Sequence, residues 1–284
     1  RFLILAVMCV FLGMSVALWT EGTINPWHTV LAFIGAIAAH GSVNAINEYL
    51  DVKSGLDFRT VRTPFSGGSG TLIQDATKAP LVLWTAIITA LITAIIGIYF
   101  AFTVGWYILP LGIIGLAVIF TYTQWFNIKP FLCLVAPGIG FGTLMVLGTY
   151  YVLSGRFTWP ALLASFVPFF LVSNLLLLNQ FPDVEADKTV HRRHFPIVIG
   201  RKKSAVIFTA FTIATYLTII LGVVIKLTPP WTLLGLLTLV IAIPTIRGTL
   251  KNADDIPALI PSIMNNVLLN LITPALMGVG FLIG

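Results

Sequence analysis

The chain has 284 residues, of which 58% are hydrophobic and only 9% are charged, whereas soluble globular chains are about 25% charged. So few charged side chains cannot cover the surface of a chain of this length, and the composition predicts a polytopic membrane protein. It excludes a soluble enzyme, a secreted disulfide scaffold and a nucleic-acid-binding domain, although the net charge is +6.

Long apolar segments, bounded by Gly, Pro and charged residues, predict nine transmembrane helices in a single domain over 1–284. The first lacks the cleavage site of a signal peptide, so we expect a membrane helix there. Because the chain begins at Arg1 without Met, we expect further residues before it. We place the segments near 2–20, 27–50, 80–102, 104–123, 130–153, 159–181, 204–226, 230–247 and 258–283.

Basic residues are distributed unequally between the two sides of the predicted membrane domain. The N-terminus and the loops after the second, fourth, sixth and eighth segments hold fourteen Lys and Arg, whereas the opposite side holds only Arg156 and Lys226. The positive-inside rule therefore predicts a cytoplasmic N-terminus. Nine of the ten acidic residues lie on this same side, and only Glu21 lies opposite. We therefore expect the polar chemistry near the cytoplasmic face.

The second segment ends in a polar stripe, NAINEYLDVKSGLD, over residues 44–57. His40 extends the stripe one turn deeper. Polar side chains in a membrane segment usually face a polar cavity, although hydrogen bonding between helices and a solvated helix end are a simpler alternative. Spacings of three and four residues place these side chains on one helical face: Asn44, Asn47, Glu48 and Asp51.

The sixth segment ends in a similar run, NQFPDVEAD, over residues 179–187. The two runs align at an offset of 132 residues, which pairs Asn47 with Asn179 and Asp51 with Asp183. This offset is close to half the chain and is consistent with two duplicated halves, about 1–130 and 131–284.

Carboxylates gathered at one membrane boundary repel one another unless cations neutralise them. Hard oxygen ligands suit Mg²⁺, which bridges carboxylates to the phosphates of a substrate. Facing acidic runs therefore predict a diphosphate site, to which nearby basic side chains would add charge-assisted hydrogen bonds. Simple adherence to the positive-inside rule is the alternative for these basic residues, and we favour a diphosphate role most for Lys129, which is alone in its loop. The candidates are Arg59, Arg62, Lys129, Lys188, Arg192 and Arg193.

Other polar residues receive structural interpretations. Asp75 and Asp255 precede predicted helices and are expected to cap them. His191 and His194 lack the spacing of metal ligands, so we expect surface or interface positions for both.

The two acidic runs resemble the motifs of the UbiA superfamily of intramembrane prenyltransferases, and the resemblance covers nearly the whole chain. An Asn-Asp-rich motif follows helix two of that family, and an Asp-x-x-x-Asp motif follows helix six; here they read NEYLDVKSGLD and NQFPDVEAD. RTPFSGGSGTL over 62–72 and the segment from Tyr122 to GTYYV at 148–152 are similar to the branch that makes menaquinone-type quinones and includes the vertebrate vitamin K enzyme. The implied fold is all-α, with the helices around a central cavity.

The resemblance also implies roles for particular residues. Arg62, Lys129 and Arg193 would hold the diphosphate, and Tyr122 matches a family position near the reacting centre. One departure is PGIGFG at 137–142, which replaces a Gly-Leu-Gly-Glu run of the branch in a region expected to border the acceptor pocket. Two metal-binding walls would be formed by Asn47, Asp51, Asp57, Asn179, Asp183 and Asp187.

The expected function is Mg²⁺-dependent transfer of a polyprenyl group from polyprenyl diphosphate to an aromatic acceptor like 1,4-dihydroxy-2-naphthoate, in quinone biosynthesis at the cell membrane. Another acceptor remains open: geranylgeranylglyceryl phosphate, hydroxybenzoate or haem. A secondary transporter is the third alternative, but its polar residues should lie near the bilayer midplane. Here the carboxylates, including catalytic candidates Asp51 and Asp183, lie at helix ends on one face.

Overall fold

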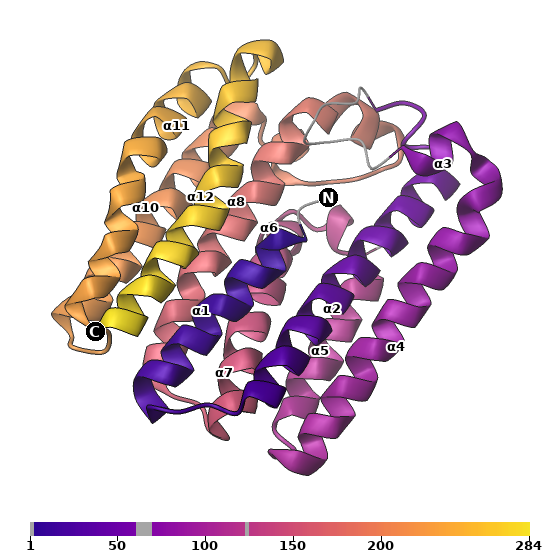
Figure 1. Cartoon of the computed structure of the whole chain (residues 1–284). Helices are drawn as coiled ribbons and strands as arrows, with labels where there is room; N and C mark the ends of the chain where they lie inside the picture. The colour runs from indigo at the N-terminus through magenta and orange to yellow at the C-terminus, as the bar shows by residue number, and fades with distance from the viewer. Residues whose placement is uncertain (1–2, 61–69, 123–124) are drawn as a thin grey trace.

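The structure is a computed structural model that describes residues 3–60, 70–122 and 125–284 (Figure 1). The described residues form helices and contain no strand, which confirms the all-α prediction. The main elements are α1 (Ile4–Glu21), α2 (Pro26–Lys53), α3 (Thr71–Gln74), α4 (Ala79–Thr103), α5 (Ile108–Thr121), α6 (Pro130–Gly138), η3 (Ile139–Val146), α7 (Leu147–Ser154), α8 (Trp159–Thr189), α9 (Phe195–Val198), α10 (Arg201–Val224), η4 (Pro230–Thr238), α11 (Leu239–Lys251) and α12 (Ile256–Ile283).

Within the described residues, eight helical stretches are long and apolar enough to cross a membrane. The protein is therefore a multi-pass membrane protein. The predicted segment at 104–123 becomes α5, a helix of 14 residues, whose length of about 21 Å is shorter than a hydrocarbon core of about 30 Å. Nine full spans are therefore not confirmed.

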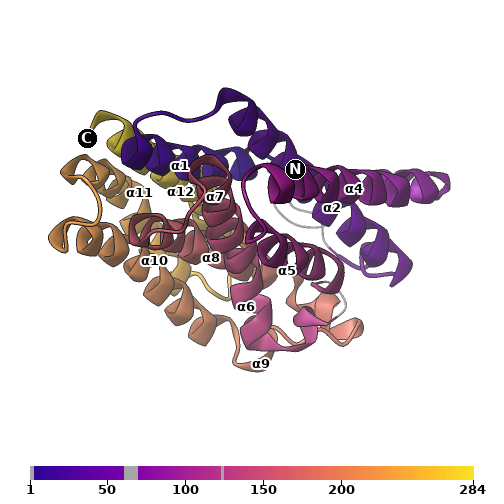
Figure 2. The same cartoon turned by 90° about the horizontal axis from the view of Figure 1, so that it is seen from below.

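The helices form two groups joined by a central layer. Seen from below, α2, α4 and α5 lie on one side and α10, α11 and α12 on the other, with α1, α7 and α8 between them (Figure 2). The main buried cluster draws its side chains from α1, η3, α7, α8, α10, α11 and α12. The internal duplication remains a prediction.

Helix starts follow the expected capping chemistry. Asp255 Oδ1 accepts a hydrogen bond of 3.1 Å from the Ala258 N–H at the start of α12, and Asp75 accepts one from Thr77. The contact of Asp255 confirms its predicted cap, because the carboxylate satisfies an N–H that the first helical turn leaves open. Asp75 caps the short 3-10 helix Ala76–Lys78 that leads into α4, whereas no described side chain caps α4 itself.

The helix α8 runs beyond its predicted end. We expected the segment to stop near residue 181, where Pro182 and several charges follow, but the helix continues to Thr189 with Pro182 inside it. Proline removes one backbone donor and kinks a helix without always ending it. The second acidic motif therefore lies on a helix that extends about two turns further than predicted.

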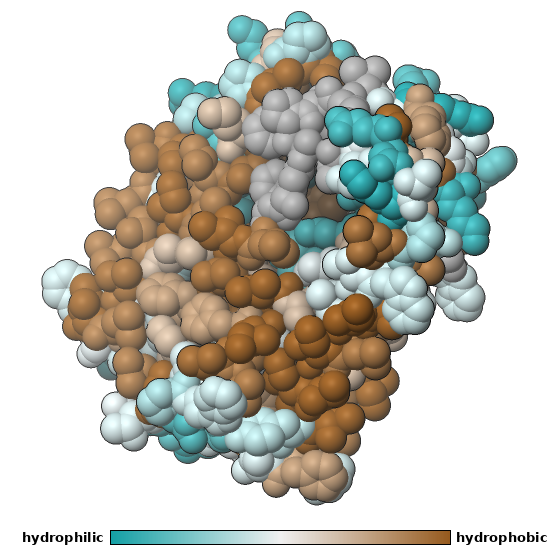
Figure 3. All heavy atoms as spheres, turned by 45° about the vertical axis from the view of Figure 1, so that its right-hand side comes forward, coloured by the Kyte–Doolittle hydropathy of each residue, from teal (hydrophilic) through white to brown (hydrophobic). Residues whose placement is uncertain are grey.

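Hydrophobic side chains cover most of the face shown in Figure 3, and hydrophilic ones gather toward the end at which α2 finishes. At the other end of the helices, where α1 finishes, the Arg156 guanidinium pairs with the Glu21 carboxylate at 2.8 Å. The charged groups are thus concentrated at the two ends of the helices, as expected when an apolar belt lies between them.

Candidate active site

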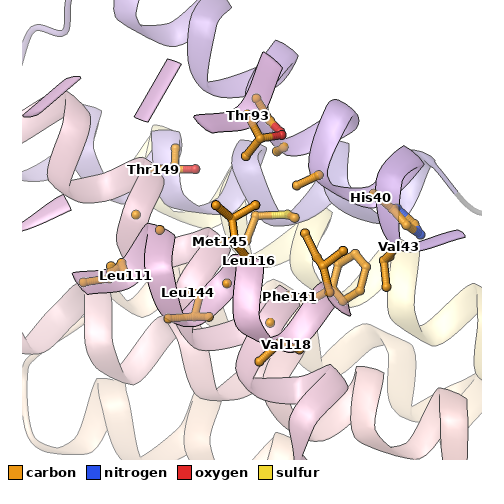
Figure 4. Close-up of a pocket in the computed structure, with 18 of the residues that line it drawn as sticks. His40, Val43, Thr93, Leu111, Leu116, Val118, Phe141, Leu144, Met145 and Thr149 are labelled. Atoms are coloured by element: carbon orange, nitrogen blue, oxygen red, sulfur yellow. The ribbon is translucent and has the colours of Figure 1, made fainter. Parts of the chain in front are cut away.

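A cavity of about 420 Å³ lies between α2, α4, α5, η3 and α8 (Figure 4). Most of its lining is apolar, and Phe100, Ile108 and Val152 lie toward the end far from the acidic motifs. The polar part of the lining is small. Thr93 of α4 and Thr149 of α7 add two hydroxyl groups away from the acidic motifs. Near the acidic motifs it comes from α2, α8 and the end of α5: His40, Asn44, Asn47, Asn179 and Tyr122. The cavity therefore joins a polar end to an apolar interior.

The first acidic motif lies where α2 ends. Asp51 is in the last helical turn, and its side chain is 21% exposed. The chain then folds back, so that the Leu56 N–H donates to the Asp51 carbonyl at 2.9 Å. This turn brings Asp57 next to the helix end, where it is buried.

The second acidic motif lies along one face of α8, with its members one turn apart. Asn179 lines the cavity, and its Oδ1 atom is buried without a hydrogen-bond partner in the described part of the chain. Asp183 is half-buried, whereas the Asp187 side chain is only 3% exposed. An amide oxygen that has no hydrogen-bond partner next to a cavity can coordinate a cation or accept a hydrogen bond from a ligand.

Arg192 connects the two motifs. Its Nη2 atom donates to Asp51 Oδ1, and its Nη1 atom donates to Asp187 Oδ1 at 3.0 Å. The guanidinium is largely buried, with a side-chain exposure of 17%. Burial acts against the charge, but the carboxylates of Asp51 and Asp187 outweigh it and raise the pKa of Arg192 above its ordinary value. Arg192 is thus a fixed cation between the motifs.

His194 completes this network from within the protein. Its Nε2 atom lies 2.8 Å from Asp187 Oδ2, and the residue is buried. The expected surface or interface position was therefore wrong for His194, although His191 is exposed. Asp187 offers a buried carboxylate that the imidazole satisfies, and sequence spacing gives no sign of this contact.

A tight turn after α8 directs both side chains inward. His191 has a φ of 61°, in the left-handed region, and the Arg192 N–H donates to the Asp187 carbonyl at 3.1 Å. The next N–H, that of Arg193, donates to the Asn127 carbonyl at 2.7 Å. The backbone of Arg192 is therefore held from both sides.

The remaining predicted residues have different surroundings. Tyr122 lines the cavity, and its hydroxyl lies 3.8 Å from Cys133 Sγ. Lys129 and Arg193 are exposed, and neither is part of the cavity lining. Arg62 lies outside the described residues. The basic residue that lies between the two motifs is therefore Arg192. The resemblance had instead implied Arg62, Lys129 and Arg193 as the residues that hold the diphosphate.

The donor set of the two motifs suits a hard divalent cation. It consists of carboxylate and amide oxygens, the ligands that Mg²⁺ prefers, and it includes the unpartnered oxygen of Asn179. Among the described residues, no three His, Cys, Asp or Glu side chains are close enough together to hold a metal ion. Since Arg192 lies between Asp51 and Asp187, metal binding by both requires side-chain movement.

The departure at 137–142 lies against the cavity as expected. Pro137, Gly140 and Phe141 contribute to the lining. Gly142 faces the other way, and a Cβ atom there would lie 2.6 Å from Phe169 Cα of α8. A glycine is therefore required at this close approach between η3 and α8.

Comparison with known proteins identifies relatives of the same kind. The chain is 25% identical to the 1,4-dihydroxy-2-naphthoate octaprenyltransferase of Bacillus subtilis over 214 residues, which cover 74% of this chain and 67% of that protein. The apo structure of a UbiA homologue from Aeropyrum pernix K1 has a TM-score of 0.75 at 17% identity, with 99% of this chain and 97% of that chain covered. A UbiA homologue from Archaeoglobus fulgidus, bound to DMAPP and Mg²⁺, gives a TM-score of 0.60 at 15% identity, with 98% and 96% covered.

The sequence also matches the UbiA prenyltransferase family over residues 6–259, which is most of the chain. This match agrees with the helical architecture and with the two acidic motifs that end at one side of the cavity. The chain is therefore a prenyltransferase that belongs to the UbiA prenyltransferase family.

Proposed function

We propose that the protein transfers a polyprenyl group from polyprenyl diphosphate to an aromatic acceptor of the 1,4-dihydroxy-2-naphthoate type, in the biosynthesis of a membrane quinone. The observation that carries this proposal is that Asn47 and Asn179, one from each acidic motif, line the polar end of one apolar cavity. The activity of the Bacillus subtilis relative supports the choice of acceptor.

The donor substrate fits the two-part character of the site. An isoprenoid tail is apolar and suits the cavity interior, whereas a diphosphate suits the end that carries Asn47 and Asn179. The proposed metal-binding residues remain Asn47, Asp51, Asp57, Asn179, Asp183 and Asp187. Bound Mg²⁺ would supply stabilisation of the negative charge that develops on the leaving diphosphate, and the Archaeoglobus fulgidus homologue, bound to DMAPP and Mg²⁺, supports this cofactor.

The reaction also requires that water be excluded from the allylic carbon of the prenyl group, which becomes positively charged. The allylic C–O bond breaks with its electron pair on the diphosphate, and an acceptor ring carbon attacks the allylic carbon. The attacked ring carbon then loses its proton; where it carries a carboxyl group instead, CO₂ leaves from that carbon and the carboxyl proton is released. The apolar lining excludes water, and Phe141 presents an aromatic ring to the cavity, which favours positive charge near its face.

His40 is our candidate for contact with the acceptor. It lines the cavity, is 5% exposed and packs against Phe141, with ring centroids 4.7 Å apart. Its Nδ1 atom has no hydrogen-bond partner among the residues that the structure describes. An isoprenoid tail has no polar atom to offer, whereas an aromatic diol has hydroxyl groups, so we assign this nitrogen to an acceptor hydroxyl.

The distribution of Lys and Arg supports a cytoplasmic N-terminus and an active site near the cytoplasmic face. By the same rule the Glu21–Arg156 ion pair would lie on the opposite side. Polyprenyl diphosphates are charged at one end, and a cytoplasmic opening would admit that end from the aqueous side.

Product analysis by mass spectrometry tests the proposal. Purified protein is incubated with Mg²⁺, geranylgeranyl diphosphate and a mixture of 1,4-dihydroxy-2-naphthoate, hydroxybenzoate and geranylgeranylglyceryl phosphate. We expect a prenylated naphthoquinone precursor, and none without Mg²⁺. Prenylation of another acceptor would replace the proposed acceptor and keep the donor site, whereas intact diphosphate with no product would contradict the proposed function.

A further inference from the structure

The Arg192 guanidinium lies between the two acidic motifs, where the metal ion and the diphosphate are proposed to bind. It donates to one oxygen of Asp51 and one of Asp187, and the second Asp187 oxygen already contacts His194. Both carboxylates belong to the proposed metal-binding set. A guanidinium and a divalent cation compete for the same carboxylate oxygens, because their like charges would be only a few ångströms apart.

The diphosphate offers Arg192 an alternative partner. A guanidinium binds phosphate oxygens as readily as carboxylate oxygens, often with two parallel hydrogen bonds. The site must also neutralise more negative charge when the diphosphate is bound than when it is absent. Arg192 can therefore leave the carboxylates without losing an anionic partner only when the diphosphate arrives.

Only the side chain of Arg192 is free to move from the carboxylates to the diphosphate. The Arg192 and Arg193 N–H groups are bonded to the Asp187 and Asn127 carbonyls, and His194 is buried against Asp187. The backbone on both sides of Arg192 is therefore anchored. The long side chain retains freedom to change partners, since its guanidinium keeps a partial opening to solvent of 17%.

We propose that Arg192 is a positioning residue that holds the two acidic motifs together before substrate binds and transfers from their carboxylates to the diphosphate when metal and diphosphate bind. This inference rests on the proposed function. Its consequence is positive coupling: metal alone competes with Arg192 and binds weakly, whereas metal and diphosphate together release Arg192 into a favourable contact.

The test measures binding to the purified full-length protein, without turnover. Mn²⁺ serves as the metal probe in titrations followed by electron paramagnetic resonance, with and without inorganic diphosphate. In wild type we expect diphosphate to tighten Mn²⁺ binding about tenfold or more, within the usual range of coupling between sites. In Arg192→Gln, Mn²⁺ alone should bind more tightly than in wild type, while diphosphate in the presence of Mn²⁺ should bind about tenfold more weakly.

Two further variants keep the result interpretable. Arg192→Lys retains the charge and should recover part of the coupling. Lys202→Gln removes a charge from an exposed side chain that pairs only loosely with Asp254, at 3.5 Å, and should behave as wild type.

Weaker binding of Mn²⁺ alone to Arg192→Gln would overturn the inference, since Arg192 would then support the metal site instead of competing for it. Unchanged coupling in Arg192→Gln would overturn it too, and in both cases the proposed function would stand. If wild type bound neither Mn²⁺ nor diphosphate, the proposed function would fail and this inference with it.

Discussion

The ends of α2 and α8 carry similar sequences in different structures. The helix α2 stops at Lys53, two residues after Asp51, and its third acidic residue, Asp57, comes from the returning turn. The helix α8 instead continues to Thr189. Asp51 keeps an exposed side-chain fraction of 21%, whereas Asp187 keeps 3% and has Arg192 and His194 as partners.

The two helices differ again where they enter the cavity. His40 and Asn44 continue the polar stripe of α2 into the lining. The α8 residues at the same offset of 132 are Val172 and Leu176, which are apolar. The comparison indicates a division of labour, in which the end of α8 anchors the buried ion-pair network and α2 extends the polar lining deeper into the cavity.

The largest expected effect comes from the buried carboxylate of α8. Asp187→Asn leaves the guanidinium of Arg192 and the imidazole of His194 without their shared anion, and breaking a buried ion pair costs about 3–5 kcal/mol. We expect a large fall in the free energy of unfolding, measured by denaturation in detergent micelles. Glu185→Gln on the same helix removes only an exposed pair with Lys188 and should change stability by less than about 1 kcal/mol; equal effects of the two variants would contradict the division.

The next largest effect is expected at Asp51 and Asp183, which the offset of 132 residues pairs. Asp51→Asn and Asp183→Asn should each lower the rate of diphosphate release about 10²- to 10³-fold, the usual cost of removing one group that stabilises developing charge. The measurement is release of diphosphate from geranylgeranyl diphosphate at saturating Mg²⁺. A normal rate for either variant would remove that motif from the proposed site.

A smaller effect is expected at His40, which lies in the part of α2 that extends deeper into the cavity. His40→Leu should raise the KM for the acceptor about tenfold, the value of one hydrogen bond of about 1.4 kcal/mol, and leave the KM for the prenyl diphosphate unchanged. His40→Asn, which can supply a polar atom near the position of Nδ1, should recover part of the affinity. His28→Leu is the control on α2, because His28 Nδ1 already contacts the Val152 carbonyl at 3.2 Å; an equal rise in KM there would contradict a specific role for His40.

The smallest effect lies in the turn after α8. His191 has a positive φ of 61°, which costs a residue with a side chain about 1–2 kcal/mol. His191→Gly should therefore raise stability slightly, by up to about 1 kcal/mol after the entropy of glycine is included. Val190→Gly, at a position with φ of −110°, should lower stability, and a gain at both positions would show that backbone strain is not the cause.

Much of this architecture follows from the sequence. The composition predicted a membrane protein, and the two acidic motifs were recognisable because Asn and Asp recur at helical spacing where apolar segments end. The end of α8 was predicted too early, because Pro182 and the charges after it are typical of a helix terminus. Arg192 did not stand out from Lys188 and Arg193, since all three satisfy the positive-inside rule, and no local pattern indicates the left-handed turn that directs it inward. The roles of the site residues remain predictions.

The glycine contact between η3 and α8 has a consequence for how the cavity can change. A Cβ at Gly138 or Gly142 would meet the Phe169 backbone, at 2.3 Å from its oxygen or 2.6 Å from its Cα, whereas one at Gly140 meets nothing within 4 Å. Overpacking of this kind typically costs 1–3 kcal/mol. Variation of this wall is therefore expected between the two close contacts: replacement of Gly140 or Phe141 would reshape the space offered to a substrate, while Gly138 and Gly142 keep the wall packed against the helix that carries the second acidic motif.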